Sequence, residues 1–174
     1  MTTIYFVPDE HHQSRKLIGD MMSKYHQSLN DAGVRIGVLF AANEEGPAVK
    51  HGGYPAHATI KIMSLKDRVT KGYDAELMVS EESWDGFDED QRAALIDHEL
   101  THLEIVSKKG VVQRDDIDRP KLKTRKGDWN CGDGFAEVVA RHGRASIEFE
   151  NARTAIRHAE ESLPKVGEGE GEPE

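Results

Sequence analysis

The sequence contains one cysteine and no long hydrophobic run. A single cysteine, Cys131, excludes a disulfide within the chain. No segment approaches the roughly 20 apolar residues that a membrane-spanning helix requires, so we expect no interaction with a membrane. The N-terminus also lacks the basic segment and apolar stretch of a secretory signal. These absences predict a cytoplasmic protein.

Positive charge is also scarce. The chain has 23 Lys and Arg against 32 Asp and Glu, which gives a formal net charge of −9. A surface that neutralises phosphates needs an excess of basic residues, so nucleic acid is not an expected partner. At 174 residues and 37% hydrophobic, the chain suits one domain with a modest core. We expect that domain over residues 1–163 and a disordered, acidic Gly/Glu tail over residues 164–174.

One short motif stands out from this composition. Residues 98–102 read His-Glu-Leu-Thr-His, which is the pattern H-E-x-x-H. Residues four apart lie on one face of a helix, so His98 and His102 can bind a single zinc ion. Glu99 stands beside them, where it can accept a proton from a water at the metal. The motif predicts zinc-assisted hydrolysis, with two metal ligands and a catalytic base.

The residues around the motif favour a helix. Apolar side chains recur three or four residues apart and predict a core-facing side: Ala93, Ile96, Leu100 and Leu103. Acidic residues 88–90 predict the N-terminal cap, and the sequence Lys-Lys-Gly at residues 108–110 predicts the end. Asp97 and Glu104, on either side of the motif, are candidates to orient a zinc-binding imidazole.

Elsewhere the patterns alternate between helix and strand. Further helices are predicted over residues 9–29, 135–143 and 145–163, the last of them at the periphery of the domain. Strands are predicted over residues 4–7, 34–40, 58–63 and 75–80, and a hairpin over residues 111–125. Either of the two strands before the motif could offer its edge to an extended substrate. His11, His12 and His26 are predicted to face solvent, and His142 to interact with a helix terminus.

Four segments carry a likeness to a known family: residues 73–87, 94–102, 127–129 and 135–143. Together they resemble the putative phage metallopeptidase family, which is found in phages and prophages, and the likeness covers most of residues 1–143. The resemblance implies a small zincin-like α+β domain in which a short mixed sheet packs against the motif helix and flanking helices. It also implies one Zn²⁺ ion and hydrolysis of peptide or protein substrates in the cytoplasm of the host cell.

The third zinc ligand is less well defined. A zinc hydrolase needs three protein ligands and an open position for water, and the motif supplies only two ligands. Members of the family commonly have a His-Asp pair before the last helix, whereas this chain has Gly127 and Asp128 at the matching positions. The resemblance therefore makes Asp128 the predicted third ligand, with Cys131, Asp133 and Glu137 as alternatives. The missing histidine leaves a second function open: a zinc-binding but non-catalytic phage accessory domain that interacts with other proteins.

Overall fold

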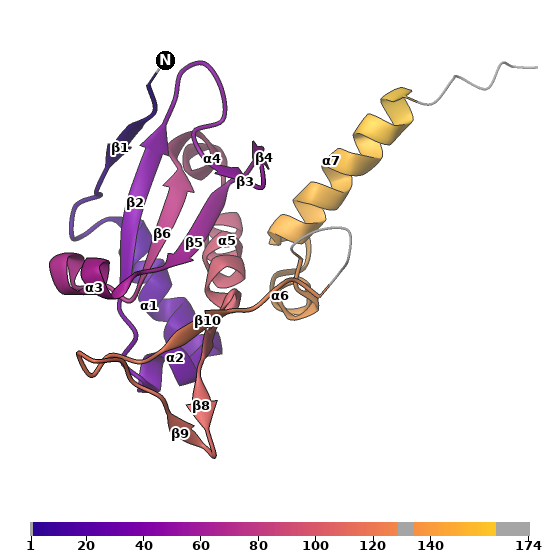
Figure 1. Cartoon of the computed structure of the whole chain (residues 1–174). Helices are drawn as coiled ribbons and strands as arrows, with labels where there is room; N and C mark the ends of the chain where they lie inside the picture. Colours follow the sequence, from indigo (N-terminus) through magenta and orange to yellow (C-terminus); the bar gives the residue numbers. More distant parts are fainter. Residues whose placement is uncertain (1, 129–133, 163–174) are drawn as a thin grey trace, which may run out of the picture.

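A four-stranded sheet forms the centre of the computed structural model, which describes residues 2–128 and 134–162 (Figure 1). The strand order is β1 (Ile4–Phe6), β2 (Ile36–Ala42), β6 (Ala75–Ser80) and β5 (Ala58–Ile62). The two inner strands, β2 and β6, run parallel, and each outer strand is antiparallel to its neighbour. The sheet is therefore mixed, and the fold is α+β, as the sequence predicted. The predicted tail over residues 164–174 lies outside the described residues.

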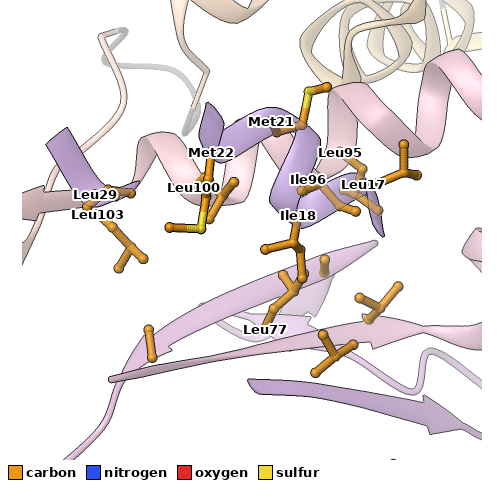
Figure 2. Close-up of a cluster of buried hydrophobic side chains, with 14 of the residues drawn as sticks. Leu17, Ile18, Met21, Met22, Leu29, Leu77, Leu95, Ile96, Leu100 and Leu103 are labelled. Atoms are coloured by element: carbon orange, nitrogen blue, oxygen red, sulfur yellow. The ribbon is translucent and has the colours of Figure 1, made fainter. Parts of the chain in front are cut away.

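Helices pack on one face of this sheet. Among the described helices, α1 (Gln13–Tyr25) and α5 (Glu89–Thr101) make the most extensive contact with each other and lie side by side (Figure 1). Figure 2 shows the apolar side chains at this junction. Ile18 of α1 lies against Leu77 of β6, while Met22 approaches Leu100 of α5 (Figure 2). All four side chains are buried, and burial of each such side chain contributes about 1.5–3 kcal/mol to folding. The helix with the H-E-x-x-H motif is thereby held on a rigid core.

The remaining helices are short, apart from the last. They are α2 (Gln27–Asp31), α3 (Leu65–Lys71), α4 (Glu81–Gly86), α6 (Ala136–His142), the 3-10 helix η1 (Gly143–Ala145) and α7 (Ile147–Ser162). Figure 1 shows α7 beginning near α5 and α6 and then running away from the sheet. Within the described residues, no helix is both long and apolar enough to span a membrane.

Three two-stranded ribbons complete the part of the fold that is described. They pair β3 (Lys50–His51) with β4 (Tyr54–Pro55), β7 (Leu103–Ile105) with β10 (Leu122–Thr124), and β8 (Ser107–Lys108) with β9 (Val111–Val112). The predicted hairpin over residues 111–125 is formed next to its turn, where Arg114 bridges Pro120, the Asp115 N–H donates to the Arg119 carbonyl and the Lys121 N–H donates to the Gln113 carbonyl, both at 2.8 Å. Beyond that point the prediction is wrong, because residues 111–112 pair with β8 and residues 122–124 pair with β7.

The predicted end of the motif helix is also wrong. The helix stops at Thr101, and the chain enters β7 directly after His102. Residues 103–105 gain a strand partner in β10, and the buried Leu103 packs in the core from that extended conformation. Lys109 and Gly110, with φ of 52° and 78°, form the turn of the β8–β9 hairpin and do not terminate a helix. Glycine and turn signals alone do not distinguish these two outcomes.

Candidate metal centre

The motif helix α5 begins as the sequence predicted. The Asp88 side chain accepts a hydrogen bond from the Gln91 N–H at 2.8 Å, and the Gln91 side chain accepts one from the Asp88 N–H at 3.1 Å. This reciprocal capping box satisfies two backbone donors that the first turn would otherwise leave without partners. The last two turns of the helix are buried, because α1 and the sheet cover one side while α6 and α7 approach another. His98 and Glu99 are only 8% and 5% exposed.

A carboxylate forms a hydrogen bond with Nδ1 of His98. Its Nδ1 lies 2.8 Å from Oε1 of Glu148, in the first turn of α7. The same carboxylate oxygen accepts a hydrogen bond from the Phe135 N–H at 3.0 Å. Burial alone would raise the pKa of Glu148, but the hydrogen bonds from His98 and Phe135 outweigh it and hold that pKa below its ordinary value. Glu148 is therefore an ionised acceptor at neutral pH.

His102 is held by the backbone of Arg125. The Nδ1 atom of His102 lies 2.9 Å from the Arg125 carbonyl oxygen. In return, the Arg125 N–H donates to the His102 carbonyl oxygen at 2.7 Å. The backbone hydrogen bond continues the pairing of β7 with β10 by one step, and it thereby places the Arg125 carbonyl oxygen against the His102 ring.

Both motif imidazoles therefore have their Nδ1 atoms against acceptors. A neutral imidazole in this arrangement carries its proton on Nδ1 and its lone pair on Nε2, which is a common metal-binding atom. The centroids of the two imidazole rings lie 5.0 Å apart. The buried Phe135 ring packs against both, with its centroid 5.2 Å from that of His98 and 4.7 Å from that of His102. Two oriented imidazoles are a donor set that zinc favours.

The predicted third ligand, Asp128, occupies a more exposed position. One of its carboxylate oxygens accepts the Ala136 N–H at the start of α6, and the other accepts from the Arg125 guanidinium, each at 3.1 Å. Those two contacts, the backbone hydrogen bond first, lower the pKa of Asp128. Among residues 2–128 and 134–162, no three His, Cys, Asp or Glu side chains form a group that could hold a metal.

The alternatives to Asp128 divide into two kinds. Glu137 is described, and its carboxylate pairs with the guanidinium groups of Arg125 and Arg141. Cys131 and Asp133 lie outside the described residues. The structure thus places His98 and Glu99 on α5 and His102 at its C-cap, with the two imidazole rings close together. Asp128 forms a salt bridge with Arg125, whose carbonyl oxygen lies against the His102 ring.

Asp97 serves a second, separate cluster. It is completely buried and accepts hydrogen bonds from His26 at 2.6 Å, from His142 at 2.9 Å and from Arg141 at 2.9 Å. Burial alone would raise the pKa of Asp97, yet these partners lower it well below its ordinary range. The prediction that His26 faces solvent is wrong, and the imidazoles that Asp97 orients are those of His26 and His142. Glu104 is exposed and pairs with Lys123 at 3.1 Å.

The sequence does not indicate the roles of two residues of this region. Its pattern places Phe135 at the start of a helix and Glu148 in a helix at the periphery of the domain. The start of α7 is in fact buried, since Ser146, Ile147 and Glu148 are each at most 7% exposed. Glu148 stands 50 positions after His98, so no local spacing rule connects them. The sequence offers one weak indication of the role of Glu148. Ser146 is a typical helix-capping residue, which would place Glu148 in the first turn of the helix.

The strand order of the sheet shows which strand has an unpaired edge that could bind a substrate. β6 is paired on both sides, with β2 and with β5, so it has no edge to offer. β5 is the outermost strand of the sheet and contacts α5 (Figure 1). Of the two strands considered from the sequence, only β5 remains a candidate.

Comparison with known proteins places this arrangement in a family. No curated protein and no solved structure matches the chain. A family model described as "Putative phage metallopeptidase" matches residues 8–159, which include the sheet strands β2, β5 and β6, the helix α5 and most of α7. An α+β domain with an H-E-x-x-H helix beside a mixed sheet is consistent with that description and with a zincin-like fold. The chain belongs to the putative phage metallopeptidase family.

Proposed function

We propose that this protein is a zinc-dependent metallopeptidase in which His98 and His102 bind the metal and Glu99 is the general base. The observation that supports this most strongly is the orientation of the two imidazoles. Each has its Nδ1 against a fixed acceptor, Glu148 for His98 and the Arg125 carbonyl for His102. Second partners of this kind raise the basicity of a ligating histidine and fix its tautomer.

The proposed chemistry follows from the motif. Zinc at this site would lower the pKa of a water to near 7 and polarise the carbonyl of the scissile bond. Glu99 would accept the proton from that water and deliver it to the leaving amine. The buried position of Glu99, one residue from His98, suits this role because electrostatic interactions are stronger where water is excluded.

Asp128 remains our proposed third ligand. It lies on the segment between β10 and α6, and its salt bridge to Arg125 connects it to the residue whose carbonyl holds His102. To bind zinc, the Asp128 carboxylate oxygen that accepts from the Arg125 guanidinium would have to give up that hydrogen bond. Asp128→Ala, Cys131→Ser, Asp133→Asn and Glu137→Gln, compared for zinc content, would rank the four candidates, and the true ligand should show the largest loss.

The substrate class that fits is an extended peptide or an unfolded protein segment. An outer strand presents unpaired backbone N–H and C=O groups, which can pair with a peptide as an added strand. β5 is such a strand and lies next to α5. A peptide bound along β5 would therefore pass close to the motif helix.

The test combines zinc content with hydrolysis. Purified wild type should hold one zinc per chain by elemental analysis and should cleave an unstructured protein such as casein. His98→Ala should lose the zinc, and Glu99→Gln should keep it and lose cleavage. If zinc is bound but Glu99→Gln changes no hydrolytic activity, the alternative of a non-catalytic zinc-binding accessory domain is favoured. Absence of zinc from the wild type would exclude both.

A further inference from the structure

Glu148 is a buried acid with an unusual set of contacts. Its side chain is only 2% exposed, and its Oε1 faces both His98 Nδ1 and the Phe135 N–H. Its other oxygen, Oε2, is buried and has no hydrogen-bond partner among the described residues. Buried polar atoms in proteins are nearly always satisfied, and an exception calls for an explanation.

Packing does not explain this choice of residue. Ile147, the residue before Glu148, already anchors α7 in the hydrophobic core at 6% exposure. An apolar side chain in place of Glu148 would avoid the cost of burying a charge, and such replacements are often neutral or stabilising. A carboxylate at this position differs from an apolar side chain in one respect: it can accept a hydrogen bond from Nδ1 of His98.

The geometry keeps that carboxylate in place. Ser146 caps the start of α7, with its hydroxyl accepting the Phe149 N–H at 3.2 Å. Glu148 then falls in the first helical turn, where the helix dipole favours a negative charge. The Phe135 N–H holds Oε1 from one side while the Phe135 ring packs against both motif histidines. One acid thereby joins α5, α6 and α7 at a single point.

We propose that Glu148 is a positioning residue for the metal centre: it holds His98 as the Nδ1–H tautomer with Nε2 directed to the metal, and it makes α7 part of the site. This inference rests on the proposed function, because it assigns His98 as a ligand. It goes beyond that function, because zinc affinity would then depend on Glu148 in α7 as well as on the motif.

The first test reads the tautomer in the metal-free wild type. Nitrogen-15 NMR of the imidazole groups at neutral pH should show the His98 proton on Nδ1, and Glu148→Gln should weaken that preference. A proton on Nε2 of His98 in the wild type would overturn the proposal without any variant. Because no zinc is present, this result is independent of whether the protein is an enzyme.

The second test measures zinc affinity by competition with a chromophoric chelator. Glu148→Gln should lower the affinity about 10- to 100-fold, the usual effect of losing such a partner. Glu160→Gln, an exposed acid on the same helix, should leave it unchanged. Ile147→Ala should lower the melting temperature by removing core packing and should leave the affinity and the His98 tautomer unchanged.

The outcomes separate the two claims. Equal losses of zinc affinity in Glu148→Gln and Ile147→Ala would mean that Glu148 only docks α7, and would overturn the proposal. A folded Glu148→Gln variant with wild-type affinity and wild-type tautomer would overturn it as well. Failure of the wild type to bind zinc would refute the proposed function, whereas the tautomer would still test Glu148.

Discussion

Replacing Asp97 by asparagine should destabilise the protein while leaving the motif histidines in place. Asp97 is the common acceptor for His26, His142 and Arg141, and it is completely buried. Removing one member of a buried charged cluster typically costs 3–5 kcal/mol, since the remaining groups keep their desolvation cost. Arg141 is partly exposed and also pairs with Glu137, which softens the loss. We therefore expect about 3 kcal/mol for Asp97→Asn.

That free energy corresponds to a fall in melting temperature of roughly 6–12 °C for a chain of this size. The assay is urea unfolding followed by circular dichroism, with thermal unfolding as a second measurement. Glu104→Gln is a suitable control, because that carboxylate is exposed and an exposed ion pair such as the one it forms with Lys123 contributes about 0–1 kcal/mol. Asp97→Asn should also keep zinc affinity close to that of the wild type, since its partners are His26 and His142.

The effect of Asp97 should depend on pH in a defined direction. The folded-state pKa of Asp97 lies below its ordinary value of 3.8. A group with a lowered folded pKa stabilises the protein above its unfolded pKa, and loses that contribution as the pH falls toward the folded value. The stability difference between wild type and Asp97→Asn should be constant at neutral pH and shrink below about pH 5. A difference under 0.5 kcal/mol at pH 7, or one that grows in acid, would refute this reasoning.

Three further predictions concern packing. Phe135→Ala should lower the free energy of unfolding in urea by about 3–5 kcal/mol, because the ring is fully buried. It should also lower zinc affinity, because both motif imidazoles lose the ring that packs against them, and an unchanged affinity would contradict this argument. Gly37→Ala should cost about 1–3 kcal/mol, because the new methyl would lie 2.5 Å from the Tyr73 ring. Gly19→Ala, in an exposed turn of α1 with open space around it, should instead stabilise the protein by about 0.5–1 kcal/mol, and a loss there would be evidence against the assigned helix.

Local patterns predicted most of the scaffold. The strands β2, β5 and β6 follow from short runs rich in apolar and β-branched residues, and the start of α5 follows from the Asp88 cap; both signals act over a few positions. The end of α5 was mispredicted because β10, about 20 residues later in the chain, competes for residues 103–105. Such a pairing depends on the tertiary fold, which overrides local propensity.

The candidate site shows the same division. His98, Glu99 and His102 are predicted by a spacing of four residues within one helix. The partners that orient the two imidazoles come from Arg125, 23 residues on, and Glu148, 50 residues on. Asp97 and His26 were misjudged for the same reason: polar residues on a helix are usually exposed, and only the packing of α1 and α6 against α5 buries this pair.

The most direct test of the proposed function is the hydrolysis of casein by zinc-loaded wild type and Glu99→Gln, with the zinc content of both measured on the same samples. We predict one zinc per chain in each protein, and a loss of at least 100-fold in the hydrolysis rate for the variant, within the range of general acid–base catalysis. Equal rates from two equally zinc-loaded proteins would contradict the assignment of Glu99 and the peptidase function with it.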